Sequence, residues 1–344
     1  MKRDNRKIGI WLLCGCILIF CMVVIGGITR LTGSGLSITE WKPIMGTIPP
    51  LNKADWEIAF QKYKQIPQFQ QVNYDFSLED FKTIFFWEYF HRLIGRLIGI
   101  VFIVPFLWFY FKGMFDKKTL GKVLFLFLLG GLQGFLGWFM VKSGLAERTS
   151  VSHIRLAIHL LTAFLTFGFT LYFALELLKK RDENNAYNKG LYHLVSLILF
   201  VTTIQLVYGA FVAGMHAGKI YNTYPLMNGK IFPVGALALH PVWINIFDNQ
   251  GTVQFIHRWL AALLVIMSFA LFYKILKGKI NVTQKTGVLF LVIAISIQFL
   301  LGVYTLLSGV NFTLAIFHQA GAFFVFSAGV YLLYVFGRAK ESIS

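Results

Sequence analysis

Long apolar segments, separated by shorter polar ones, follow one another along the whole of this chain of 344 residues. A helix needs roughly 20 mostly apolar residues to cross about 30 Å of hydrocarbon. Eight segments meet that length, at 8–28, 85–111, 123–141, 154–178, 191–214, 251–273, 286–308 and 314–337. Helices satisfy their own backbone hydrogen bonds inside lipid. The pattern therefore predicts an all-α integral membrane protein with eight transmembrane helices.

The polar connections differ in length between the two sides. Residues 29–84 form a long outer loop, in which the spacing of Trp56, Ala59, Phe60 and Tyr63 predicts a short amphipathic helix. The first span follows a few basic residues without a small-residue cleavage site, so we expect a retained helix and not a signal peptide. All three cysteines lie in this first span, where we expect apolar packing and no disulfide.

The second half of the chain repeats the first. Residues 133–137 (QGFLG) match 298–302 (QFLLG), residues 87–92 (WEYFHR) match 253–258 (VQFIHR), and 41–46 more weakly match 224–229. Each unit has an even number of spans, so the two copies share one orientation. We predict two tandem four-helix bundles, 1–182 and 183–344, related by pseudo-two-fold symmetry along the membrane normal.

One histidine lies near the same end of each even-numbered span: His91, His159, His257 and His318. Each is about 8–10 Å inside its span at 1.5 Å per residue. Two histidines on facing helices of a bundle can supply both axial ligands of a haem iron. The pairs are His91 with His159 and His257 with His318. A single membrane histidine can instead bond a neighbouring helix, but four at one depth in a duplicated unit favour haem.

The remaining histidines do not follow the repeat. They lie in loops or at span ends, and we expect ordinary interfacial roles for them: His153, His193, His216 and His240.

The two halves differ beside their first histidine. Glu88 lies three residues before His91, whereas Gln254 lies at the same place before His257. The spacing puts Glu88 and His91 on one helix face, so the first half offers a carboxylate for acid, base or cation-stabilising chemistry. An alternative is that Glu88 only complements the helix dipole.

Three arginines are candidate partners for haem propionates. Arg92 and Arg258 directly follow the first histidine of each pair and could bind carboxylates bidentately or merely anchor their helices at the interface. Arg30 has no basic counterpart in the second half, where Ala213 takes its place, so we expect it to serve the first site alone.

Composition and charge fit a bilayer protein. Hydrophobic residues make up 57% and charged residues 14% of the chain. The net charge of +17 reflects topology, because eighteen of the 32 lysines and arginines flank the same side of the spans. Both termini are then cytoplasmic and the haem sites lie toward the outer face, while nucleic acid is excluded as a partner. The absence of an Arg- and Ser-rich transit segment favours the plasma membrane.

Several motifs resemble those of the haem A synthase family, of the longer bacterial and mitochondrial type. The similarity covers almost the whole chain and is specific, although the cysteine pairs that some members carry in outer loops are absent. The matching segments are 30–37 (RLTGSGLS), 40–43 (EWKP), 88–92 (EYFHR) with 95–96, 222–227 (NTYPLM), 257–258 and 318–319.

The resemblance implies an oxidoreductase that converts one ring methyl group of haem O to a formyl group by successive hydroxylations. It implies substrate haem O at Glu88, His91 and His159, and haem b at His257 and His318. A haem O synthase and terminal oxidase assembly factors are the partners it suggests, and a homo-oligomer stays open. A dihaem electron-transfer protein and a haem carrier are the competing hypotheses.

Overall fold

Helices form nearly all of the computed structural model, which describes residues 5–40, 47–145, 148–179, 188–278 and 280–337. Within these ranges there is no strand, and eight helices are long and apolar enough to cross a membrane. The predicted all-α membrane architecture is thus confirmed. The eight are α1 (Asn5–Leu31), α4 (Leu78–Phe111), α5 (Lys117–Leu145), α6 (His153–Leu178), α7 (Lys189–Gly214), α9 (Gln250–Lys277), α10 (Val282–Leu307) and α11 (Phe312–Phe336).

Helix α4 begins seven residues before the predicted span. Ser77 caps it: its hydroxyl accepts from the Asp80 amide, and the Asp80 carboxylate accepts from the Ser77 amide. This reciprocal capping box stabilises a first turn that is too polar to register as a span. Hydrophobicity therefore located the membrane segment but not the start of the helix.

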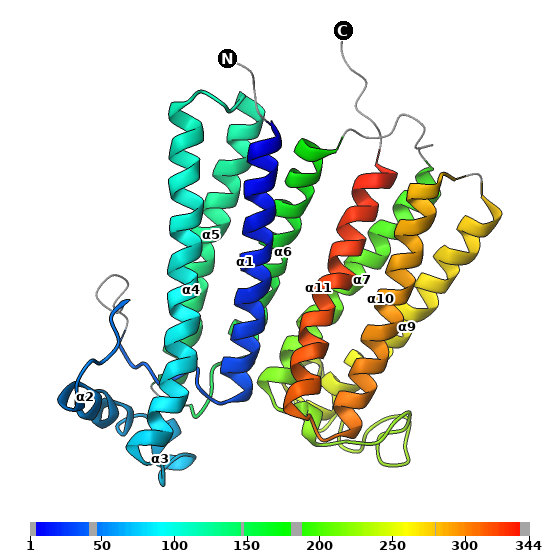
Figure 1. The fold of residues 1–344 in the computed structure, drawn as a ribbon. Helices are drawn as coiled ribbons and strands as arrows, with labels where there is room; N and C mark the ends of the chain where they lie inside the picture. Colours follow the sequence, from blue (N-terminus) through cyan, green and yellow to red (C-terminus); the bar gives the residue numbers. More distant parts are fainter. Residues whose placement is uncertain (1–4, 41–46, 146–147, 180–187, 279, 338–344) are drawn as a thin grey trace.

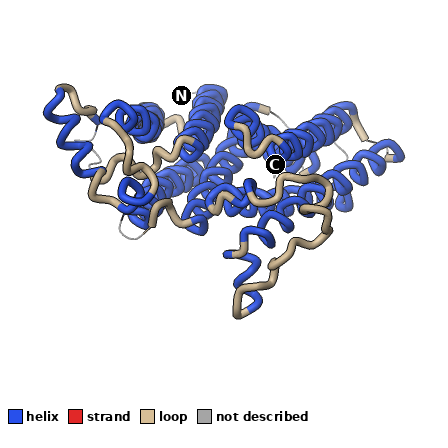
Figure 2. The backbone as a smooth tube through the Cα atoms, turned by 90° about the horizontal axis from the view of Figure 1, so that it is seen from below, coloured by secondary structure: helices blue, strands red, loops and turns tan. Residues whose placement is uncertain are grey.

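The long helices form two groups that lie side by side in Figure 1, with α1, α4, α5 and α6 in one and α7, α9, α10 and α11 in the other. Helix α1 begins and α11 ends on the same side. The opposite side carries the long connections, seen in front of the helices in Figure 2. Those connections include α2 (Lys53–Tyr63), α3 (Pro67–Gln71), α8 (Asn245–Asp248) and the short 3₁₀ helices η2 (Ala217–Lys219) and η3 (Val242–Ile244).

Helix α2 confirms the predicted amphipathic helix in the long connection between α1 and α4. Phe60 and Tyr63 are buried, and their rings pack against Phe81 at the start of α4. The three cysteines of α1 are free thiols. The matched segment 41–46 and the predicted boundary between 182 and 183 lie outside the described residues.

An aromatic cluster fills the seam between the two groups. Phe164 stacks on Phe323 with ring centres 4.2 Å apart, Phe164 also meets Phe326, and Phe167 meets Phe323. Phe164 and Phe167 lie five and eight residues after His159 on α6. Phe323 and Phe326 lie at the same distances along the chain after His318 on α11. Equivalent residues thus exchange contacts, as they do around a two-fold axis. The pseudo-two-fold relation of the whole bundles stays a prediction.

Polar contacts also join the two groups at several depths. Tyr334 Oη donates to the Lys179 carbonyl (2.6 Å), and Gln319 Nε2 donates to the Val23 carbonyl (2.6 Å). Arg30 Nη1 donates to the Ala213 carbonyl (3.0 Å), and His153 Nε2 lies 3.1 Å from Asp248 Oδ1. Each joins the first group, or the residue after it, to the second group or, for Asp248, to α8 in the connection between α7 and α9. The seam is therefore held by hydrogen bonds as well as by aromatic packing.

The Gln319 contact gives a stability prediction. Its amide lies against Gly27 and bonds a main-chain carbonyl of α1, so Gln319→Leu removes the donor at nearly constant volume. Interhelical hydrogen bonds in membranes contribute about 1 kcal/mol. We expect a lower midpoint of thermal unfolding in detergent, followed by circular dichroism. Gln61→Leu is the control, because Gln61 is an exposed residue of α2 that bonds Glu57 on the same helix. Equal midpoints for both variants would contradict the assignment.

Candidate haem-binding site

One cavity of about 1270 Å³ is lined by residues of both helix groups. His91 on α4, His159 on α6, His257 on α9 and His318 on α11 all line it. Glu88 and the three candidate arginines line it too. The structure thus brings every residue that the sequence singled out to one connected space.

The second histidine pair has the separation that an iron between two imidazoles needs. The rings of His257 and His318 have centres 6.4 Å apart and planes at 88°. Two metal–imidazole bonds of about 2 Å, with about 1 Å from each nitrogen to its ring centre, span about 6 Å. No group of three or more His, Cys, Asp or Glu able to hold a bare metal ion occurs in the described ranges. Two histidine ligands suffice for an iron whose other ligands come from the ring of a haem.

Each of the four histidines lies against a glycine on the preceding helix of its bundle. A Cβ added to the glycine would lie 2.9–3.3 Å from the imidazole Cε1. Bulkier side chains would push the rings out of place. The pairs are Gly26 with His91, Gly137 with His159, Gly209 with His257 and Gly302 with His318.

In both halves, a glutamine donates a hydrogen bond to the main chain of the second histidine of the pair. Gln133 Nε2 donates to the His159 carbonyl (3.1 Å), and Gln298 Nε2 donates to the His318 carbonyl (2.7 Å). Both glutamines belong to the repeated segment found in the sequence. The halves differ at the first histidine: Gln205 approaches His257, whereas Met22 lies at the equivalent position on α1. An amide therefore approaches the first histidine of the second pair, whereas a thioether takes that place on α1.

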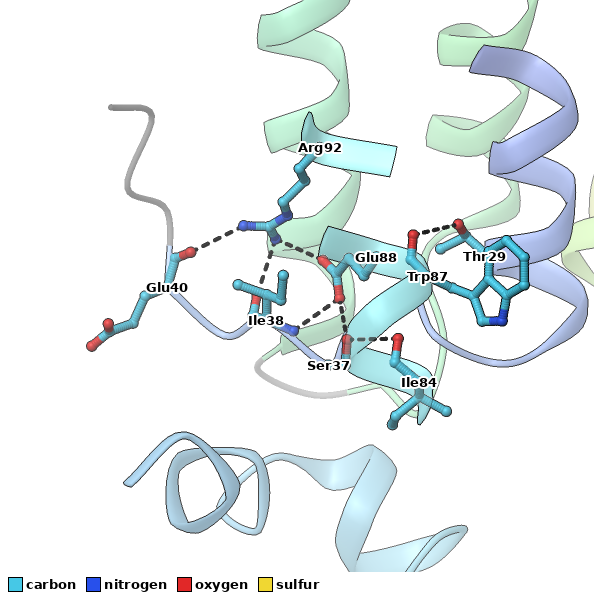
Figure 3. Close-up of polar contacts among 8 residues, drawn as sticks. All are labelled: Thr29, Ser37, Ile38, Glu40, Ile84, Trp87, Glu88 and Arg92. Carbon is cyan, nitrogen blue, oxygen red and sulfur yellow. Dashed lines mark hydrogen bonds and ion pairs between the residues drawn. The ribbon is translucent and has the colours of Figure 1, made fainter. Parts of the chain in front are cut away.

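The Glu88 carboxylate, which is only 3% exposed, is fixed by three donors (Figure 3). Oε2 accepts from Ser37 Oγ and from the Ile38 amide, both at 2.8 Å, and Oε1 accepts from Arg92 Nη2 at 2.7 Å. The donors lie in the segment that follows α1 and on α4 itself. The carboxylate thus provides a fixed negative charge and also holds the connection after α1.

The second half repeats this connection without the charge. Arg92 donates to the carbonyls of Ile38 (3.0 Å) and Glu40 (3.1 Å); Arg258 donates to those of Tyr221 and Thr223, both at 2.8 Å. Gln254, 2% exposed, donates to the Tyr221 carbonyl at 3.1 Å. The contacts of Arg92 and Arg258 observed here fit the anchoring alternative. Among the described residues, the buried Nε atoms of both Arg30 and Arg258 have no hydrogen-bond partner.

Sequence reasoning missed four contributors to the site. Ser37 lies inside a quoted motif, but nothing in the sequence showed that its hydroxyl reaches Glu88. Gly137 and Gly302 recur in the repeat, a signal that could have identified the glycine contacts. His216, predicted to be an ordinary interfacial residue, lines the central cavity.

Comparison with known proteins agrees with this geometry. A family model described as cytochrome oxidase assembly protein matches residues 9–330. Haem A synthase of Flavobacterium johnsoniae is 46% identical, covering 97% of this chain and 99% of its own. Those of Nitrosospira multiformis and of Wolbachia pipientis from Culex pipiens are 45% and 43% identical, covering 95% and 96% of this chain and 93% and 98% of their own.

Proposed function

The chain belongs to the cytochrome oxidase assembly protein family, and from that premise we propose that it is a haem A synthase, an oxidoreductase acting on haem O. The observation that carries the proposal is one cavity lined by two histidine pairs and, among the described residues, by the carboxylate of Glu88 from the first half. Identity of 42–46% over nearly full length to haem A synthases supports the same activity.

We assign the first pair, His91 and His159, to the substrate haem O, because Glu88 lies on the same helix as His91. We assign His257 and His318 to haem b, because their ring centres, 6.4 Å apart, would let both imidazoles hold one haem iron. When bound there, haem b supplies one-electron redox chemistry. Gln298 orients its ligand by bonding both the main chain of His318 and, at 3.2 Å, its Nδ1.

The role proposed for Glu88 is to stabilise a developing cationic carbon at the substrate methyl group, or to take a proton from attacking water. Ser37, Ile38 and Arg92 hold its oxygens in place before the substrate arrives, so little reorganisation is needed during reaction. The neutral amide of Gln254 cannot provide a charge at the equivalent place. This difference supports the proposal that the first half is the site of chemistry.

The proposed topology puts both termini in the cytoplasm of a bacterial cell, in the plasma membrane, and the histidines toward the outer face. The helix ends beside the lysine-rich short connections share one side of the protein, and the long connections share the other. Positive residues accumulate on the cytoplasmic side of membrane proteins. A haem O synthase is then the class of enzyme that must supply the substrate.

Analysis of bound pigments tests the proposal. The protein is produced in cells that make haem O, purified, and its extracted haems are separated by chromatography and identified by mass. We expect haem A together with an intermediate hydroxylated at the ring methyl. Haem b alone, despite available haem O, would overturn the proposal in favour of dihaem electron transfer, and unmodified haem O would favour a carrier. The sequence relatives give neither alternative any support.

A further inference from the structure

A cluster of three basic side chains lies where the two helix groups meet at the ends that carry the long connections. Arg30 lies in the last turn of α1, while His216 precedes η2 and Lys219 is its last residue, shortly after α7. All three line the cavity that the four histidines line. We refer to Arg30, His216 and Lys219 as the junction cluster. It combines one residue of the first half with two of the second.

Arg30 reaches across the seam to the end of α7. Its Nη1 donates to the Ala213 carbonyl at 3.0 Å, and the His216 amide donates to the same carbonyl at 3.3 Å. A basic side chain at a helix C-terminus commonly makes this contact. The buried Nε still has no hydrogen-bond acceptor. The contact with the Ala213 carbonyl therefore uses only part of the hydrogen-bonding capacity of the Arg30 guanidinium.

The three side chains are close enough to affect one another. Burial lowers the pKa of His216, and the charges of Arg30 and Lys219 lower it further. No acidic side chain pairs with any of the three in the part of the chain that the structure describes, because Glu88 bonds Arg92 and Asp248 bonds His153. His216 and Lys219 are exposed and Arg30 is half-buried, and basic groups this close repel one another unless a counter-charge lies between them. An anion from outside the chain would supply it.

The backbone at the junction is also unusual. His216 has φ of 54°, in the left-handed region that side chains other than glycine seldom adopt. The Lys219 amide bonds the His216 carbonyl at 3.1 Å and closes η2 beside Arg30. Such conformations persist where the surrounding structure enforces them, and they gather at ligand sites. The turn brings His216 and Lys219 to the cavity edge.

Helix α1 connects the junction cluster to the first histidine pair. Gly26 lies against His91, and Arg30 follows one turn later toward the end that carries the long connections. Positions four apart share a helix face. A ring bound at His91 could carry an anionic group that points toward the long connections. Such a group would meet Arg30 first.

We propose that Arg30, His216 and Lys219 bind a carboxylate of the tetrapyrrole held by His91 and His159, so that the second half completes the substrate site of the first. This inference rests on the proposed function. It extends the expectation that Arg30 serves the first site by adding two residues that the first half lacks. A phosphate of a lipid headgroup has related anionic chemistry and is distinguished by the experiment.

The test compares the full-length protein, its second site filled, with a variant carrying His216→Gln and Lys219→Gln. Both are titrated with protohaem and with protohaem dimethyl ester, in which the carboxylates are blocked, and the Soret band is followed. Loss of charge-assisted bonds predicts about tenfold weaker binding of protohaem. Binding of the ester is expected to be the same for both proteins. Lys230→Gln, an exposed lysine of the same connection, is the control and leaves both affinities unchanged.

Three outcomes would overturn the inference. Unchanged protohaem affinity would show that the junction cluster does not meet the ring carboxylates, and equal weakening of acid and ester would show a purely structural role. The third measurement is the phosphatidylglycerol that the protein retains after reconstitution in phosphatidylglycerol or phosphatidylcholine vesicles. If the variant differs from the wild type only in this amount, the cluster binds lipid. If the wild-type chain gives no bis-histidine spectrum at the first site, the proposed function itself fails.

Arg30→Gln provides a second variant. It is expected to weaken protohaem binding more than ester binding, while an unfolding midpoint measured in parallel reports the lost contact with Ala213. Equal effects on the two ligands would again contradict the assignment.

Discussion

Glu88→Gln is expected to reduce haem A formation by about 100-fold or more, the range typical for loss of a positioned catalytic carboxylate, while both haem sites stay filled. The substitution gives the first half the neutral amide that the second half carries at Gln254. An amide nitrogen cannot accept from Ser37, Ile38 or Arg92, and the fixed charge is lost. The measurement is haem A formed per bound haem, from extracted pigments.

Ser37→Ala separates the charge of Glu88 from its support. This variant removes one of three donors but keeps the carboxylate, so the rate is expected to fall by less than about tenfold, as a single hydrogen bond allows. Normal haem A production by Glu88→Gln with normal haem content would remove Glu88 from the mechanism. Parallel loss of haem and activity would indicate that Glu88 only holds the connection after α1.

Gly302→Leu is expected to weaken haem b binding at the second site by about tenfold or more, which corresponds to an overpacking cost of at least about 1.4 kcal/mol. Even a Cβ at residue 302 would lie 2.9 Å from His318 Cε1, so a larger side chain must displace the imidazole. The first pair has its own glycines, Gly26 and Gly137, and is expected to keep its ligand. Haem stoichiometry and the reduced-minus-oxidised spectrum measure the loss.

Gly121→Leu is the matched control on another transmembrane helix. A Cβ there has open space within 4 Å, and leucine is the better helix former. We therefore expect unchanged haem content. Retention of haem b with an unaltered spectrum in Gly302→Leu would show that the glycine contact does not position His318.

The sequence also has clear limits at the arginines and the interfacial histidines. Arg92 and Arg258 bond main-chain carbonyls of the connections after α1 and α7, partners that lie 35 to 54 residues away along the chain. His216 was grouped with residues outside the repeat, yet it lines the central cavity. Motif spacing describes one helix at a time and carries no information on which loop returns to it.

By itself the sequence determined the eight membrane spans, the duplication, the histidines and the difference between Glu88 and Gln254. These are properties of local hydrophobicity, length and residue identity, which need no knowledge of neighbours. Only the tertiary structure decided that all four histidines line one cavity, that each rests on a glycine of another helix, and that Arg30 meets residues of the opposite half. Those features arise from the packing of helices across the seam, where side chains far apart in sequence come into contact.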